Sequence, residues 1–167
     1  MKRTILLICG KAGAGKNTVA DIINEYISCE SFAFATKVKA LARDMGWNGV
    51  KDEPGRKLLQ DIGTAGRNYN NNIWANDVID RIYFSTYSYF VISDWRYRNE
   101  YEVLNKEFKN VITIRVTGRS DDLGTNSNHE SEHDLDDFNT KYTIINDGSM
   151  DKLKQRVKDI LQMEGLL

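Results

Sequence analysis

The sequence is poor in several features that would each indicate a particular class of protein. Of its 167 residues only two are cysteine, Cys9 and Cys29, and only one is proline. No apolar run approaches the roughly 20 residues that span a bilayer, and the run after Lys2-Arg3 is too short for a secretory signal. These absences argue against a disulfide-stabilised secreted protein and against a membrane protein, so we expect a cytoplasmic location.

The chain also lacks an excess of positive charge. Its formal net charge is −1, with 23 Lys and Arg residues against 24 Asp and Glu residues. Proteins that bind long nucleic acid normally carry a basic footprint, so we expect no such partner, although a few local cations can still hold a small anion. With 41% hydrophobic residues, the composition is typical of a globular protein, and we expect one domain over residues 1–167.

A glycine-rich loop stands between an apolar run, residues 4–9, and an amphipathic stretch, residues 18–27. Periodicity predicts a buried strand for the first and a helix for the second. Glycines permit backbone angles that turn consecutive amides inward, and the positive end of the following helix completes an anion cradle. The loop comprises Gly10, Lys11, Ala12, Gly13, Ala14, Gly15 and Lys16.

This loop predicts a phosphate-binding site. Lys16 can reach the β- and γ-phosphates of a nucleoside triphosphate as a point charge. The next position usually holds a Ser or Thr that binds Mg²⁺, but here it holds Asn17, followed by Thr18. Asn17 can offer only a carbonyl oxygen to the metal. The alternative, a glycine-rich turn with a chance lysine, does not explain the strand and helix on either side.

Strand-like and helix-like segments alternate along the rest of the chain. Strands are predicted over 31–34, 89–94, 111–116 and 142–146, and helices over 37–45, 52–62, 74–82, 100–108 and from Ser149 to about Gly165. This alternation predicts an α/β fold with a parallel sheet, whose carboxyl edge binds ligands. We expect Gly63-Thr64 to break the 52–62 helix and to place Arg67 beyond it.

Asp94 ends an apolar strand and so falls at the same sheet edge as the glycine loop. A carboxylate there can hold Mg²⁺ directly or through water, or it can cap the next helix. Arg96, Asn99 and Glu100 follow closely. Asn99 can also be a helix cap, and Glu100 can favour a helix first turn.

A second cluster consists of Arg56, Gln60, Gly63, Thr64 and Arg67. Arginine and glutamine together suit an anionic group beside a base edge or a sugar. The alternative is a solvated helix face with ordinary surface arginines, and spacing alone favours that alternative.

Residues 118–139 are polar, acidic and too numerous for a routine connection, which indicates either a functional flap or a solvated loop. Arg115 and Arg119 flank its start and favour the flap. The run His129-Glu130-Ser131-Glu132-His133 matches the zinc-protease motif H-E-x-x-H, but its neighbours are polar, whereas a zinc-binding helix is normally buried.

The succession of these motifs resembles the viral-type deoxynucleoside monophosphate kinases, which are P-loop relatives of adenylate kinase. After the glycine loop, the matching residues are Thr18, Asp21, Gln60, Gly63, Thr64, Arg67, Trp74, Asp94, Arg96, Asn99, Glu100 and the run 129–132. The resemblance implies a three-layer P-loop kinase fold, in which helices flank a five-stranded parallel sheet. It also implies an acceptor-binding segment at about 32–82 and a mobile lid at about 119–139.

The same resemblance implies that the γ-phosphate of ATP passes, with Mg²⁺, to a deoxynucleoside monophosphate. The implied catalytic residues are Lys16, Arg67, Arg96 and Arg119, and the metal ligands are Asn17 and Asp94. Arg119, with Arg115 as a second candidate, would move in with the lid. ATP would be held by residues 10–18. The acceptor would be bound by Lys37, Arg56, Gln60, Thr64, Arg67, Trp74, Asp94, Arg96, Asn99, Glu130 and Glu132.

Two alternatives remain open at this stage. One is a P-loop kinase of a non-nucleotide acceptor, such as phosphomevalonate or dephospho-coenzyme A. The other is a nucleotide-binding regulator without catalysis, which the unusual Asn17 motivates. The sequence leaves open whether the chain is a monomer or a homodimer.

Overall fold

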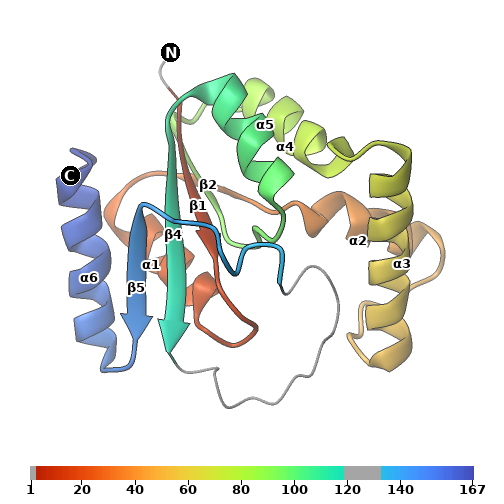
Figure 1. Ribbon diagram of the computed structural model, residues 1–167, viewed down its shortest axis with the longest axis horizontal. Coiled ribbons are helices and arrows are strands. Elements are labelled where there is room, and N and C mark those ends of the chain that lie inside the picture. The colour runs from red at the N-terminus through yellow and green to blue at the C-terminus, as the bar shows by residue number, and fades with distance from the viewer. Residues whose placement is uncertain (1–2, 119–132) are drawn as a thin grey trace.

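The computed structural model describes residues 3–118 and 133–167, and within these ranges strands alternate with helices (Figure 1). This confirms the predicted α/β class. The elements are β1 (Thr4–Cys9), α1 (Lys16–Tyr26), β2 (Glu30–Phe32), α2 (Ala35–Asp44), α3 (Glu53–Tyr69), α4 (Ile73–Phe84), β3 (Tyr89–Ile92), α5 (Arg98–Phe108), β4 (Val111–Gly118), β5 (Tyr142–Asn146) and α6 (Met150–Met163).

The described strands form one parallel sheet in the order β2-β3-β1-β4-β5. β1 is central, and its Ile5 lies in register with Phe90 of β3 and with Val111 of β4. Because all five strands run the same way, their carboxyl ends meet at one edge. The glycine loop follows β1 and Asp94 follows β3, so both lie at that edge as predicted.

Helices cover both faces of the sheet, which gives the expected three layers (Figure 1). In β1, Leu6 and Ile8 pack into a core with α1 and α6. Ile5 and Leu7 point to the other face, where α4 and α5 complete a second core. This alternation makes β1 buried on both faces, and the continuous apolar run of its sequence reflects that burial.

Helix α3 runs from Glu53 to Tyr69 without a break at Gly63-Thr64, so the prediction that these residues end the helix is wrong. A glycine costs a helix about 1 kcal/mol relative to alanine, which packing can offset. Here Trp74 of α4 packs on this part of α3: its Nε1 donates to the Gly63 carbonyl oxygen at 3.0 Å, and a Cβ on Gly66 would lie 2.2 Å from its ring. Glycine lets α3 and α4 pack closely, and Arg67 therefore belongs to α3.

Two helix starts match sequence expectations. Asp52 caps α3 by accepting a hydrogen bond from the Gly55 amide at 2.8 Å. Ser149 caps α6 by accepting one from the Lys152 amide at 3.3 Å. Among the helices in the described ranges, none is both long and apolar enough to cross a membrane.

Candidate functional site

The loop between β1 and α1 has a backbone shape that glycine alone adopts without strain. Gly10 and Gly15 have φ angles of 145° and 99°. A Cβ on Gly10 would lie 2.2 Å from the Val116 carbonyl oxygen, and one on Gly15 would lie 2.4 Å from Asn146 Nδ2. The loop leads directly into α1, whose first amides have no partners within the helix. This is the local geometry of an anion cradle.

The side chains of Lys16 and Asn146 both donate hydrogen bonds to backbone carbonyl oxygens of this loop. Lys16 Nζ donates to the carbonyl oxygens of Gly10 at 2.6 Å and Lys11 at 2.8 Å, so its charge lies across the loop. Asn146, at the end of β5, is 4% exposed, and its Nδ2 donates to the Ala14 carbonyl oxygen at 2.9 Å. Sequence reasoning missed Asn146. Its place at the carboxyl end of the last strand was the available signal.

The two expected metal ligands are engaged in different ways. Asn17 Oδ1 accepts a hydrogen bond from Ser93 Oγ at 3.0 Å. The two carboxylate oxygens of Asp94 accept hydrogen bonds from the amides of Phe34 and Ala35, each at 3.0 Å. Asp94 therefore caps α2, and not the next helix in the sequence. Burial raises the pKa of the Asp94 carboxyl above its usual range, and those two amides oppose the shift.

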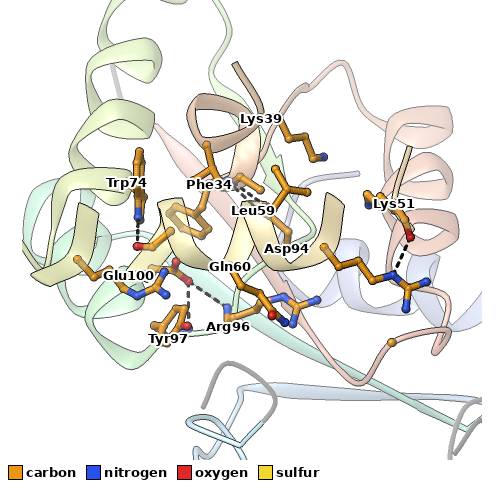
Figure 2. A pocket seen from close by; sticks show the side chains of 16 residues that line it. Phe34, Lys39, Lys51, Leu59, Gln60, Trp74, Asp94, Arg96, Tyr97 and Glu100 are labelled. Atoms are coloured by element: carbon orange, nitrogen blue, oxygen red, sulfur yellow. Dashed lines mark hydrogen bonds between the residues drawn. The ribbon is translucent and has the colours of Figure 1, made fainter. Parts of the chain in front are cut away.

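A cavity of about 480 Å³ opens beside the phosphate loop, and Ala12 of the loop is part of its wall. Figure 2 shows side chains from α2, α3 and the segment after β3 around this space. Its apolar wall contains Phe34, Val38, Leu59 and Trp74, its cations are Lys39, Lys51, Arg56, Arg67 and Arg96, and its other polar groups are Gln60, Asp94, Tyr97 and Glu100. The cavity thus combines apolar surface with a strong excess of positive charge.

One face of α3 supplies Arg56, Gln60, Gly63 and Arg67 to this cavity, because their spacing of four, three and four residues follows the helical repeat. The spacing predicts that Arg56 and Gln60 share a helical face, but the sequence could not place Arg67 there while the helix was expected to stop at Gly63. The Arg67 guanidinium carbon lies 4.2 Å from the centre of the Tyr97 ring, which is a cation–π contact.

Glu100 is buried at the inner end of the cavity, 5% exposed. Its Oε2 accepts hydrogen bonds from the amides of Arg96 and Tyr97, both at 3.0 Å (Figure 2). The sequence predicts a helix-start role for Glu100, and its bond from the Tyr97 amide, the N-cap of α5, fills that role. Burial raises the pKa of Glu100 to about 8; the nearby Asp94 adds to this shift, while the two amides and Arg67 oppose it.

Three residues expected to bind the acceptor do not line the cavity. Lys37 lies on the exposed side of α2, and Lys39 takes its place in the wall. Thr64 is exposed and accepts a hydrogen bond from Arg67 at 3.3 Å. Asn99 donates to the Asn71 carbonyl oxygen at 2.8 Å and so ties α5 to the turn between α3 and α4. Their expected roles toward a substrate have no support from this geometry.

Trp74 does line the cavity, but its polar atom is already used. Its Nε1 donates to the Gly63 carbonyl oxygen at 3.0 Å, and the side chain is 5% exposed. Trp74 therefore holds α4 against α3 and presents only ring surface. Lys51 reaches the cavity from the turn before α3, where its carbonyl oxygen accepts a hydrogen bond from Arg56 Nε at 2.9 Å.

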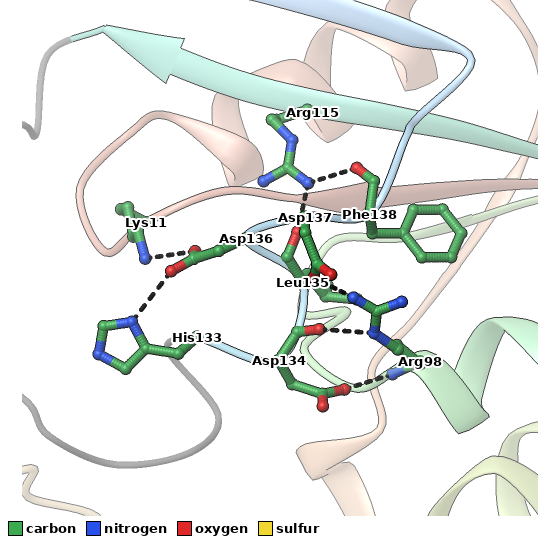
Figure 3. Close-up of polar contacts among 9 residues, drawn as sticks. All are labelled: Lys11, Arg98, Arg115, His133, Asp134, Leu135, Asp136, Asp137 and Phe138. Atoms are coloured by element: carbon green, nitrogen blue, oxygen red, sulfur yellow. Dashed lines mark hydrogen bonds and ion pairs between the residues drawn. The ribbon is translucent and has the colours of Figure 1, made fainter.

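Residues 133–138 form a turn that is tied to the sheet edge by charged side chains (Figure 3). Arg115 donates to the carbonyl oxygens of Leu135 at 2.6 Å and Phe138 at 2.9 Å. Lys11 of the phosphate loop pairs with Asp136 at 2.8 Å, and His133 Nδ1 lies 3.0 Å from the other Asp136 oxygen. Arg115 is therefore an anchor for this turn, contrary to the expectation that it moves with a lid.

Several expected residues lie outside the described ranges. They are Arg119, His129, Glu130 and Glu132, together with most of the lid expected at 119–139. In the part that is described, no group of three or more His, Cys, Asp and Glu side chains is arranged to hold a metal ion. Of the H-E-x-x-H run, only His133 lies within the described ranges.

The sequence of this chain is similar to those of two viral proteins. It is 27% identical, over 96% of its length, to "Uncharacterized protein ORF77" of Ictalurid herpesvirus 1, and the match covers 71% of that protein. It is also 27% identical to the "Deoxynucleotide monophosphate kinase" of Enterobacteria phage T4, over 70% of this chain. That match spans about half of the phage protein, 49% of its length. No family model matches the chain.

Solved structures share the fold at low identity. TT1252 from Thermus thermophilus superposes with a TM-score of 0.59 at 13% identity, over 98% of both chains. A putative kinase from Chloroflexus aurantiacus gives 0.55 at 14% identity, over 97% of both chains. Dephospho-CoA kinase from Campylobacter jejuni gives 0.54 at 13% identity, over 98% of both chains. The fold is that of the P-loop kinases, and the predicted resemblance is confirmed at this level.

Proposed function

We propose that this chain is an ATP-dependent kinase that phosphorylates a deoxynucleoside monophosphate. The observation that carries the proposal is the junction of two features: Ala12 belongs both to the phosphate loop and to the wall of the cationic cavity. A phosphoryl donor bound by the loop would therefore adjoin an acceptor in the cavity. The sequence match to a phage deoxynucleotide monophosphate kinase supports the choice of acceptor class.

The reaction needs little acid–base chemistry. A phosphate monoester has a second pKa of about 6, so at neutral pH its oxygen is largely an anionic nucleophile already. That oxygen attacks the γ-phosphorus of ATP, the bond from phosphorus to the β,γ-bridging oxygen breaks, and ADP leaves. What the protein must supply is positioning and positive charge between two polyanions.

The cations around the cavity suit this task. Among the described residues, five cations, Lys39, Lys51, Arg56, Arg67 and Arg96, line one space with two carboxyl groups. Both carboxyl groups accept hydrogen bonds from backbone amides, Asp94 at α2 and Glu100 at α5. We assign the donor phosphates to Lys16 and the loop amides, and the acceptor phosphate to Arg67 and Arg96.

The nucleoside part of the acceptor would occupy the rest of the cavity. Phe34, Leu59 and Trp74 supply apolar surface for a base, and Gln60 supplies both a donor and an acceptor for hydrogen bonds. This wall and all of the cations except Arg96 come from α2, α3, α4 and their connections, which supports an acceptor-binding role for residues 32–82. A site that bound only a small anion would not need this apolar wall.

Mg²⁺ fits this site when it retains much of its water. Asn17 and Ser93 offer an amide oxygen and a hydroxyl beside the phosphate loop, and both are the hard oxygen donors that Mg²⁺ prefers. Asp94 already caps α2, so its contact with the metal would run through water. When bound with ATP, Mg²⁺ supplies charge neutralisation of the phosphates.

The test is a screen of acceptors. The chain is incubated with Mg-ATP and each of the four common deoxynucleoside monophosphates, their ribose counterparts, dephospho-coenzyme A and phosphomevalonate, and ADP formation is followed. We expect ADP only with one or more deoxynucleotides. Turnover confined to a non-nucleotide acceptor would replace this proposal by another kinase, and tight ATP binding without any turnover would indicate a regulator.

A further inference from the structure

The buried carboxyl group of Glu100 accepts hydrogen bonds from the protein backbone. Two backbone amides, Arg96 N and Tyr97 N, converge on the same carboxylate oxygen, Oε2, each at 3.0 Å. The Tyr97 carbonyl is also held, because it accepts a hydrogen bond from the indole of Trp95 at 2.8 Å. The short segment that carries Arg96 and Tyr97 is thus fixed from two sides.

The side chain of Tyr97 connects this fixed segment to helix α3. Its side chain is 8% exposed, and its ring centre stands 4.2 Å from the guanidinium carbon of Arg67, which comes from α3. Arginine is well suited to such stacking because its guanidinium is planar and weakly hydrated. Glu100 therefore supports Arg96 through that residue's own amide, and supports Arg67 through the Tyr97 ring.

We propose that Glu100 is a positioning residue that sets Arg67 and Arg96 for the phosphate of the acceptor. This inference rests on the proposed function. It adds to the site a residue that affects the two arginines through its hydrogen bonds to the backbone amides of Arg96 and Tyr97. The charged groups that face Glu100 are Asp94 and Arg67. The geometry requires a side chain long enough to bring one acceptor oxygen to both amides, and it does not require that side chain to be charged.

Three substitutions separate reach from charge. Glu100→Gln keeps a carbonyl oxygen at the Oε2 position and removes the ability to ionise. Glu100→Asp keeps an ionisable carboxyl group but is one methylene shorter, so its oxygen cannot reach both amides in the same pose. Glu100→Ala removes the acceptor altogether. Glu102→Gln, on the exposed side of the same helix, is the matched control for a loss of charge on α5.

Steady-state kinetics are measured on the monophosphate that the wild-type chain uses best. The acceptor KM should rise in those variants whose side chain cannot accept hydrogen bonds from both amides. For Glu100→Asp and Glu100→Ala we expect the acceptor KM to rise by about 10- to 100-fold, the scale of a misplaced binding group, with little change in the ATP KM. Glu100→Gln should recover most of that loss. The inference is overturned if Glu100→Gln is as impaired as Glu100→Ala, or if the ATP and acceptor KM values rise together.

A binding measurement keeps this result separate from the proposed function. Calorimetric titration with inorganic phosphate requires no turnover, and its affinities should follow the same order, with Glu100→Gln above Glu100→Asp and Glu100→Ala. A wild-type chain that phosphorylates no monophosphate would remove the proposed function, while the phosphate affinities would still decide the role of Glu100. Equal phosphate affinities in all of the variants would refute it.

Discussion

Two glycines on α3, one turn apart, are expected to respond in opposite ways to the same substitution. Gly63→Ala and Gly66→Ala each add one methyl group to a helix interior, where alanine is favoured over glycine by about 0.5–1 kcal/mol. The space around the added carbon differs. At Gly63 the nearest heavy atom is Arg67 Nη1, 3.4 Å away, which is ordinary contact with a flexible side chain. Gly63→Ala should therefore stabilise the protein.

At Gly66 the added carbon meets the ring of Trp74. Three ring atoms would lie at 2.2, 2.8 and 3.0 Å. The ring cannot retreat easily, because it is 5% exposed and its Nε1 donates to the Gly63 carbonyl oxygen at 3.0 Å. Overpacking of this kind costs about 1–3 kcal/mol, and these distances favour the upper end of that range. The helix gain is common to both variants, so their difference in stability measures the clash alone.

The assay is urea unfolding followed by tryptophan fluorescence, with calorimetry as a second measurement. For a chain of this size, 1 kcal/mol shifts Tm by about 2–4 °C. We expect Gly63→Ala above the wild-type chain and Gly66→Ala below it, with unchanged urea dependence in both. If the two variants have equal stability, α3 and α4 do not pack as closely as these distances require, and close packing on Trp74 cannot be what keeps the helix unbroken.

Three further predictions concern the phosphate loop and its surroundings. Lys16→Ala should lower phosphoryl transfer by on the order of 10²–10³, yet leave Tm nearly unchanged; near-normal ADP formation would refute its assignment to the donor. Asn146→Asp replaces a donor by an acceptor at a buried carbonyl, so ATP affinity, measured by calorimetry, should fall by about 5- to 150-fold, equivalent to 1–3 kcal/mol; an unchanged Kd would show that the loop is held by other contacts. Because the folded-state pKa of Glu100 is raised to about 8 from 4.5, the wild-type chain should lose stability relative to Glu100→Gln as pH rises through that window; a difference in unfolding free energy between the two proteins that is the same at pH 5 and pH 9 would contradict the shift.

The phosphate loop could be predicted from the sequence because its signal is local. Gly10 and Gly15 are required by backbone angles and by close neighbours, and the strand before them and the helix after them are each marked by their own periodicity. The parallel sheet was equally accessible, since alternating strands and helices favour that arrangement. None of this depends on which distant side chains meet.

Helix α3 shows why the acceptor cavity was harder to predict. A glycine inside a helical pattern normally argues against the helix, because glycine exposes the backbone and costs conformational entropy. The compensation comes from Trp74 of another helix, which donates a hydrogen bond to the Gly63 carbonyl oxygen and packs against Gly66, and these contacts have no signature in the local sequence. Once α3 is continuous, the shared face of Arg56, Gln60 and Arg67 follows at once.

Lysines on α2 show where helical periodicity is not enough. The apolar residues Val38, Leu41, Ala42 and Met45 predict one buried side, but only Val38 and Ala42 are buried, and Leu41 and Met45 are exposed. The buried face is therefore turned toward Lys39, which lies three residues before Ala42 and lines the cavity, whereas Lys37 is exposed. Periodicity in the sequence could not choose between the two lysines. Which face of α2 meets α3, however, depends on Asp94, which caps α2 from the end of β3.

The anchoring of Arg115 limits which arginine can complete the site when ATP is bound. Its Nη2 satisfies the carbonyl oxygens of Leu135 and Phe138, and the side chain is partly buried. Turning Arg115 toward the phosphates would leave both carbonyls without this donor, at a cost of about 1–3 kcal/mol for each one that stays buried. The same motion would release a turn that also holds Lys11 through Asp136. A cation that moves during the reaction should therefore come from elsewhere, and Arg115 should act by keeping this turn, and with it Lys11, against the loop.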